Sequence, residues 1–259
     1  MFVKILICIL AGFGAGIGTG FAGLSAATVI SPMLMILLNV PAYEAVGIAL
    51  ASDVLASALS AVTYAKNKNI DLKNGLVMMI AIIVCTVIGS WVAGFVKHTA
   101  MEMVSLGFTF VLGLKFIFFP VVKTEQAEEE NNRIRFIIVS IACGMMVGFV
   151  CGFIGVGGGM VMLLLLTSVL GYELKTAVGT SVFIMAFTAF TGSASRFIMG
   201  GIPNWVYLDV CVISTLVFAA LASKIANMAK AKTLNRVVGL VLVTICLSMV
   251  AVEAIRYIW

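Results

Sequence analysis

Long apolar stretches along nearly the whole chain constrain its fold more than any other feature. They cover roughly residues 2–21, 28–38, 42–64, 75–96, 101–122, 134–153, 158–170, 174–198, 205–224 and 233–256. Most reach the roughly 20 residues that a helix needs to cross a bilayer, whereas 28–38 and 158–170 are too short to cross as straight helices. Charged residues make up 10% of the chain, against about 25% in soluble domains. We therefore predict an all-α, polytopic membrane protein embedded in a lipid bilayer.

The two halves of the sequence match each other without gaps when Gly12 is aligned with Gly144. Four glycines and a tripeptide come into register: Gly12, Gly16, Gly20, Gly23 and Ala45–Gly47 align with Gly144, Gly148, Gly152, Gly155 and Ala177–Gly179. Internal duplication of this kind is common among secondary transporters. We predict a first membrane repeat at 1–123, a charged cytoplasmic linker at 124–135 and a second membrane repeat at 136–259.

The number of apolar stretches indicates that the second repeat is inverted. Each copy has five, and an odd number of spans brings the chain out on the opposite side of the membrane. The basic loops Lys66–Lys73 and Lys224–Arg236 are expected in the cytoplasm, which places both termini outside. The prediction is two inverted repeats of about five spans, each with a short broken or re-entrant helix after a glycine-rich break. The N-terminal stretch has signal-peptide features, but the repeat begins inside it, so we expect it to be the first span.

Several classes of function lack the residues that they need. The six cysteines lie in apolar stretches without CxxC spacing, and His98 is the single histidine, so we expect no metal site and no cofactor. No basic patch interleaved with aromatic residues suggests nucleic acid as a partner. No Walker A motif is present, so ATP would have to be used by a separate partner protein. These observations favour a transporter over an enzyme.

A run of three glycines, Gly157, Gly158 and Gly159, interrupts an otherwise continuous apolar region. Each glycine costs a helix interior about 1 kcal/mol relative to alanine, so the run predicts a break followed by a short helix. The start of that helix offers unpaired backbone N–H groups, which suit an anion. In the first copy, Ser25, Ala26 and Ala27 align with the glycines, and Thr28 follows them. We predict that both breaks face one cavity near the membrane midplane and bind the substrate with these residues.

Five further polar side chains lie within the apolar stretches. Asp53 is near the middle of 42–64, where a charge is costly and functional by default; it can carry a coupling proton or serve as a hydrogen-bonded structural residue. Arg196 can bind an oxyanion or extend to the membrane interface. Lys115 can be a counter-charge for the anion or for Asp53, or can likewise extend to the interface. Thr180 and Ser181 can ligate substrate oxygens or hydrogen-bond to their own preceding turn.

The segments "GFVCGFIGVGGGMVMLLLL" and "KTAVGTSVF" resemble the TauE/SafE family of membrane transporters, and the resemblance covers essentially the whole chain. It implies transport of small sulfur-containing oxyanions such as sulfite, thiosulfate or small organosulfonates. It also supports a substrate-binding role for Thr180 and Ser181. The first copy departs from the family pattern, because Ser25-Ala26-Ala27 replaces the glycines and "GIALASD" stands where the second copy has Thr180-Ser181.

The function predicted from the sequence is a secondary transporter that moves such an oxyanion across the cytoplasmic (inner) membrane by alternating access, linked to protons through Asp53. Two alternatives remain open, an anion channel and a membrane subunit of a larger complex. An intramembrane serine hydrolase, with Ser25 as nucleophile, is the least favoured because His98 lies in a loop on a different span. A homodimer is compatible with the sequence.

Overall fold

A computed structural model describes residues 2–96, 133–154, 158–200 and 203–228, together with 107, 111, 114, 240, 243, 244 and 247. Its helices in chain order are α1 (Phe2–Ala22), α2 (Ala27–Leu38), α3 (Ala42–Lys66), α4 (Leu72–Ala93), α6 (Arg133–Ile154), α7 (Gly158–Ser168), α8 (Leu174–Gly200) and α9 (Trp205–Met228). No strand occurs in these ranges. The all-helical prediction is confirmed, whereas the expected spans 101–122 and 233–256 and the linker 124–135 lie largely outside the described residues.

Five of the helices are long and apolar enough to cross a membrane: Phe2–Phe21, Ala42–Lys66, Asn74–Ala93, Lys175–Gly200 and Trp205–Ala226. Their outer faces carry large apolar side chains, as on α4, where Ile80, Val84, Ile88 and Trp91 are all exposed. The spacing of four or three residues puts these side chains on one face of the helix. A face of this kind is suited to lipid rather than water, so the multi-pass prediction is confirmed for this part of the chain.

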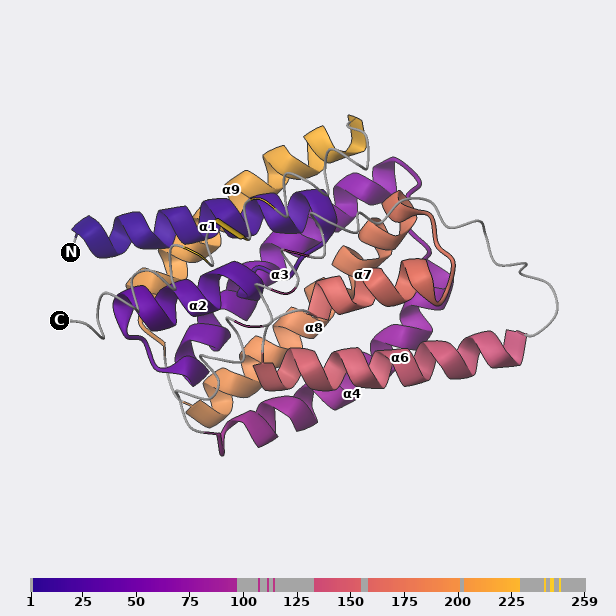
Figure 1. The fold of residues 1–259 in the computed structure, drawn as a ribbon, viewed down its shortest axis with the longest axis horizontal. Coiled ribbons are helices and arrows are strands. Elements are labelled where there is room, and N and C mark those ends of the chain that lie inside the picture. The colour runs from indigo at the N-terminus through magenta and orange to yellow at the C-terminus, as the bar shows by residue number, and fades with distance from the viewer. Residues whose placement is uncertain are drawn as a thin grey trace.

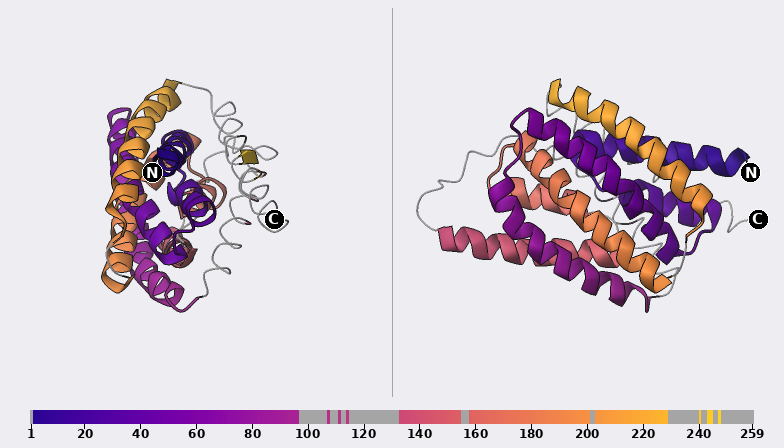
Figure 2. Two further views of the ribbon diagram at one scale, coloured as in Figure 1. Left: turned by 90° about the vertical axis from the view of Figure 1, so that its left-hand side faces the viewer. Right: turned by 180° about the vertical axis from the view of Figure 1, so that it is seen from behind.

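The described helices form two layers (Figure 2). One layer is a row in the order α9, α3, α8, α4, and the other contains α1, α2, α7 and α6 (Figures 1 and 2). Helix α1 packs on α9, α6 packs on α4, and the short helices α2 and α7 pack on α3 and α8. Each helix pair that packs together therefore has a counterpart when α1–α4 are exchanged with α6–α9.

The two short helices lie where the sequence predicts them and end in the same way. The sequence predicts short helices at 28–38 and 158–170, and the structure has α2 and α7 at these places. Asn39 and Gly171, which are equivalent in the alignment of the two halves, both adopt a left-handed conformation with φ of 54° and 69°. The next residue then donates its N–H back to the helix, from Val40 to the Leu34 oxygen at 3.1 Å and from Tyr172 to the Leu166 oxygen at 2.9 Å. In both helices this hydrogen bond spans six residues, so the two ends share one geometry.

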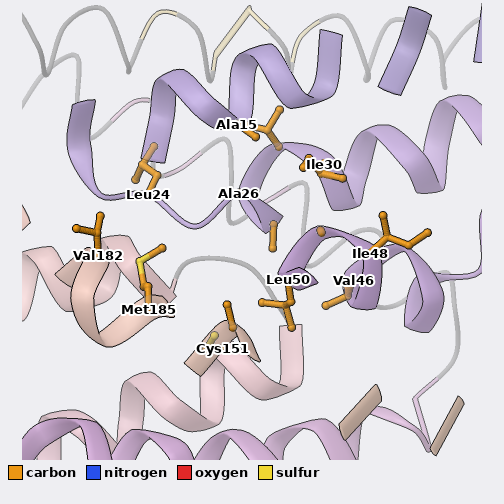
Figure 3. Packing of buried hydrophobic residues seen from close by; sticks show 14 of the residues in the cluster. Ala15, Leu24, Ala26, Ile30, Val46, Ile48, Leu50, Cys151, Val182 and Met185 are labelled. Carbon is orange, nitrogen blue, oxygen red and sulfur yellow. The ribbon is translucent and has the colours of Figure 1, made fainter. Parts of the chain in front are cut away.

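Close packing between helices depends on the glycine ladders. A Cβ atom added at Gly20 would lie 2.6 Å from the Ala222 Cβ of α9, and one added at Gly152 would meet the Thr86 carbonyl oxygen of α4. Small residues allow such backbone approach. The buried core inside the two layers combines side chains from both halves, including Ala15, Ala26 and Leu50 with Cys151 and Met185 (Figure 3).

Candidate functional site

The first break separates α1 from α2 and is fully buried. Gly23 ends α1 in a left-handed conformation with φ +62° and donates its N–H to the Thr19 carbonyl oxygen at 3.0 Å. Ser25 then brings its hydroxyl to the start of α2, where it accepts the Ala27 N–H at 3.3 Å. Ser25, Ala26, Ala27 and Thr28 are all buried, so the four residues predicted in this half of the site lie together inside the molecule.

The carboxyl group of Asp53, a residue of α3, lies at the start of α2. Its Oδ2 accepts the Ser25 hydroxyl at 2.8 Å and its Oδ1 accepts the Ser57 hydroxyl at 2.8 Å. The Ala26 backbone N–H and the Thr19 hydroxyl also face this carboxyl group, which is 1% exposed. A carboxylate at a helix N-terminus is stabilised by the unpaired N–H groups there. In the first half, the protein's own carboxyl group therefore lies where the sequence predicts a bound anion.

The second break lies against the first. It runs from the end of α6 at Ile154 to the start of α7 at Gly158, and the predicted residue Gly157 lies outside the described residues. A Cβ atom added at Gly159 would meet the Gly23 carbonyl oxygen and the Met185 sulfur. The backbone of α7's first turn thus approaches the end of α1, and the two breaks lie close together.

Arg196 of α8 reaches the end of α6 from the side. Its Nη2 donates to the carbonyl oxygens of Gly152 at 2.6 Å and Phe153 at 3.1 Å. These carbonyls belong to the last turn of a helix, where oxygen atoms lack intrahelical partners and a cation is favoured. The side chain is 1% exposed, so it does not extend to the membrane interface, which was the alternative interpretation from sequence.

The Arg196 guanidinium keeps hydrogen-bonding capacity beyond these two carbonyls. Within the part of the chain that the structure describes, its Nε and Nη1 are buried and have no hydrogen-bond partner. A buried charged group without partners is costly. Because the guanidinium presents fixed N–H donors that match oxyanion geometry, these two nitrogen atoms are the strongest indication of a ligand in the described structure.

Tyr43 covers Arg196 and was not identified from the sequence. Its ring centroid lies 4.6 Å from the guanidinium carbon, which is within the range of a cation–π interaction. Its hydroxyl donates to the Ser90 carbonyl oxygen at 3.3 Å. Gly200 makes room for the ring, since a Cβ there would lie 2.6 Å from it. The sequence carries no signal for this contact, because Tyr43 follows Pro41 at a predicted helix start, where an aromatic residue suggests only an interfacial position.

The remaining predicted residues, Thr180 and Ser181, lie in α8 near the breaks. The Thr180 hydroxyl oxygen accepts the Asp71 backbone N–H at 3.0 Å. The Ser181 hydroxyl donates to the Val178 carbonyl oxygen at 2.8 Å, and a Cβ added at Gly23 would lie 2.5 Å from the Ser181 oxygen. Ser181 therefore borders the first break, whereas Thr180 faces the loop before α4. Lys115 and His98 lie outside the described residues.

Within the described residues, no group of three His, Cys, Asp or Glu side chains could hold a metal ion. The polar groups that converge on the two breaks are instead a carboxyl group, hydroxyl groups, a guanidinium group and backbone N–H groups. This set is suited to binding a small anion and a proton.

Comparisons with known proteins identify the family. The chain is 27% identical to the probable membrane transporter protein YunE of Bacillus subtilis, over 94% of this chain and 96% of that protein. It is 22% identical to the probable membrane transporter protein YdhB of the same organism, over 86% and 91% of the two chains. A probable membrane transporter protein of Methanocaldococcus jannaschii, MJ0441, is 26% identical over 78% and 75%. No solved structure matches the chain significantly. Residues 8–249 match the family described as "Sulfite exporter TauE/SafE", and the chain therefore belongs to the TauE/SafE family of membrane proteins.

Proposed function

We propose that this protein is a secondary transporter that moves a small sulfur-containing oxyanion, such as sulfite, thiosulfate or a small organosulfonate, across the cytoplasmic membrane. The observation that carries the proposal is Arg196, a fully buried guanidinium whose Nε and Nη1 have no partner within the described residues. The description of the matching family as a sulfite exporter supports a sulfur oxyanion as the class of substrate.

In this proposal the anion lies between the two breaks. Arg196 supplies the charge, and the backbone N–H groups at Gly158 and Gly159 supply donors at the start of α7. Gly157 and the hydroxyl groups of Ser25, Thr28 and Ser181 complete the proposed set, with Ala26 and Ala27 contributing backbone. Thr180 is left out of this set, because its hydroxyl oxygen accepts the Asp71 N–H. The contact between Gly159 and the Gly23 carbonyl oxygen supports a single shared site.

Alternating access would follow from an inverted repeat of the segments 1–123 and 136–259. Two observations support this organisation. First, every packed pair of helices in one half has an equivalent pair when α1–α4 are exchanged with α6–α9. Second, equivalent helices run in opposite directions, as α1 and α6 do in Figure 1. Rocking of one repeat against the other would expose the breaks to each side of the membrane in turn.

We also propose that transport is linked to protons through Asp53, because this carboxyl group is buried at the same breaks. A channel is the alternative function, since broken helices also serve channels. Saturable counterflow distinguishes the two, because a channel does not couple the exit of unlabelled substrate to the entry of labelled substrate. A homodimer remains a prediction.

The test is counterflow of radiolabelled sulfite, thiosulfate and a small alkanesulfonate in proteoliposomes. We expect saturable exchange of at least one anion, and loss of that exchange in Arg196→Gln and in the bulky variants Gly158→Val and Ser25→Leu. Each variant is first checked for a monodisperse, folded protein in detergent. Absence of exchange for all three anions with folded wild-type protein would overturn the proposal, and conductance without counterflow would favour the channel.

A further inference from the structure

We propose that one proton accompanies each univalent oxyanion through this protein, taken up by Asp53 as the anion binds at Arg196, so that each transport step carries no net charge. This inference rests on the proposed function and adds to it a stoichiometry and a charge class of substrate.

The first argument is the balance of buried charge. Among the described residues, Asp53 and Arg196 are the only charged side chains that are buried. They have opposite signs, so the described part of the interior has no net charge when both are ionised and no ligand is bound. Net charge in a medium of low dielectric constant is costly, and a state without it is favoured.

The second argument is that these two side chains do not neutralise each other directly. Each is held by uncharged groups, Asp53 by the Ser25 and Ser57 hydroxyls and Arg196 by two backbone carbonyls. The Cys151 thiol of α6 interacts electrostatically with both charges, so both lie in the neighbourhood of the same small residue. A bound anion can therefore reach Arg196 without first breaking an ion pair.

The third argument is that the network around Asp53 can hold the carboxyl group with or without its proton. A hydroxyl group donates to a carboxylate and accepts from a carboxylic acid by rotating about its C–O bond. The groups that face Asp53 are Thr19 of α1, Ser25 and the Ala26 N–H of the break, and Ser57 of α3. The titratable groups that interact electrostatically with the pair are Cys151 and Tyr43.

The consequence is a rule about which anions are carried. When a univalent anion binds at Arg196, the interior acquires one negative charge, and one proton on Asp53 restores neutrality. A divalent anion would leave one negative charge uncompensated. We therefore infer that the preferred substrate is univalent at the site, such as an alkanesulfonate or hydrogensulfite, rather than a dianion such as thiosulfate.

The asymmetry between the halves supports one proton site and one anion site. In the alignment of the two halves, Asp53 corresponds to Met185, which lies against Gly159 at the start of α7. The start of α2 thus has a carboxyl group beside it, whereas the equivalent start of α7 has a thioether. Only the second break lacks an internal carboxyl group in the equivalent position and remains suited to an external anion.

The experiment uses proteoliposomes with a pH-sensitive dye inside and a membrane potential set by potassium and valinomycin. The probes are methanesulfonate, which is univalent at any working pH, and thiosulfate. We compare the wild type with Asp53→Asn, which is close to isosteric and removes the titratable proton. The matched control is Ser52→Ala, because the neighbouring Ser52 is equally buried but bonds to the Ile48 carbonyl oxygen of its own helix.

For the wild type and Ser52→Ala, we expect uptake of methanesulfonate with an equal entry of protons and no dependence on potential. For Asp53→Asn, we expect counterflow to persist while net uptake is lost, because the empty protein then carries an uncompensated Arg196. Net uptake by the wild type without proton entry, or uptake driven by an inside-positive potential, would overturn this inference together with the proton linkage through Asp53, and would leave the proposed anion transport standing. Absence of exchange for every anion would overturn both.

Discussion

Tyr64 and Arg196 occupy equivalent positions in the two halves of the chain, and each donates to the same carbonyl position. The Tyr64 hydroxyl donates to the Gly20 oxygen at 3.2 Å, and the Arg196 Nη2 donates to the Gly152 oxygen at 2.6 Å. Gly20 and Gly152 are themselves aligned with each other when the two halves are compared. In both halves a side chain thus donates to a carbonyl oxygen in the last turn before a helix break. The donor is a neutral hydroxyl group in the first half and a charged guanidinium group in the second.

This equivalence allows the structural role of Arg196 to be tested separately from its proposed role in anion binding. Arg196→Lys keeps the charge but loses the planar arrangement of donors, and Arg196→Gln loses the charge as well. Hydrogen bonds to a charged group contribute about 1.5–3 kcal/mol, so we expect anion affinity to fall by about tenfold to a hundredfold for each such bond lost. The measurement is the half-saturating concentration for counterflow.

Tyr64→Phe is the control for this prediction. It removes the equivalent hydrogen bond of the first half, at a cost in stability of about 0.5–1.5 kcal/mol for a neutral bond, and leaves Arg196 in place. We expect a lower melting temperature in detergent with an unchanged half-saturating concentration. A similar loss of affinity in both variants would mean that Arg196 serves only to cap α6.

Tyr43 is expected to hold the guanidinium of Arg196 in position. A desolvated cation–π contact contributes about 2 kcal/mol, and Tyr43→Phe retains the ring while Tyr43→Leu removes it. We expect Tyr43→Phe to exchange anions much as the wild type does, losing only the hydrogen bond to the Ser90 carbonyl. Tyr43→Leu is expected to need a higher anion concentration for half-saturation. Equal impairment of the two variants would assign the effect to the hydroxyl group and contradict the stacking role.

The sequence predicts the elements of this fold well because its signals are local. Apolar length defines the spans, and the glycine-rich segments define the breaks, so the predicted range 28–38 differs from α2 (Ala27–Leu38) by a single residue at its start. The start of α4 is less well predicted, at 75 rather than Leu72, because the Asp71 side chain caps the helix by accepting the Asn74 N–H. That polar turn interrupts the apolar pattern without interrupting the helix.

The site is predicted only in part, because its contacts join residues that are far apart in the sequence. Asp53 stands out as a charge in an apolar stretch, but its position at the start of α2 depends on how α3 packs against α2. Arg196 is ambiguous from sequence, since its distance from the end of a span fits both an interfacial and an internal side chain. Tyr43 gives no signal at all, because its role depends on the ends of α4 and α8 meeting the start of α3.

Thr180 offers a test of whether a predicted site residue binds the anion or fixes the fold. Its hydroxyl oxygen accepts the Asp71 N–H at 3.0 Å, and the Asp71 carboxylate accepts the Tyr172 hydroxyl at 2.7 Å, which ties α4 to the loop before α8. Thr180→Val removes the acceptor of this partly buried N–H, at a cost of about 0.5–1.5 kcal/mol for a neutral hydrogen bond. We expect a lower melting temperature with an unchanged half-saturating concentration.

Thr180→Ser keeps the hydroxyl group and should restore stability. A higher half-saturating concentration for Thr180→Val, with normal stability, would instead place Thr180 among the residues that ligate the anion. Ser181→Ala, measured in parallel, reports on the hydroxyl group that borders Gly23 rather than the loop before α4.

The contact between the two breaks should not tolerate an added side-chain atom. A Cβ atom at Gly159 would meet the Gly23 carbonyl oxygen, which is backbone and cannot rotate away, as well as the Met185 sulfur. Gly159→Ala gains about 1 kcal/mol of helix propensity, but overpacking a well-packed core costs about 1–3 kcal/mol, and the two breaks would be pushed apart. We expect a lower melting temperature together with loss of counterflow.

Gly107→Ala is the matched control, because Gly107 is also helical and a Cβ there would have nothing within 4 Å. Full activity of Gly159→Ala would show that the breaks need not touch for the anion to be carried.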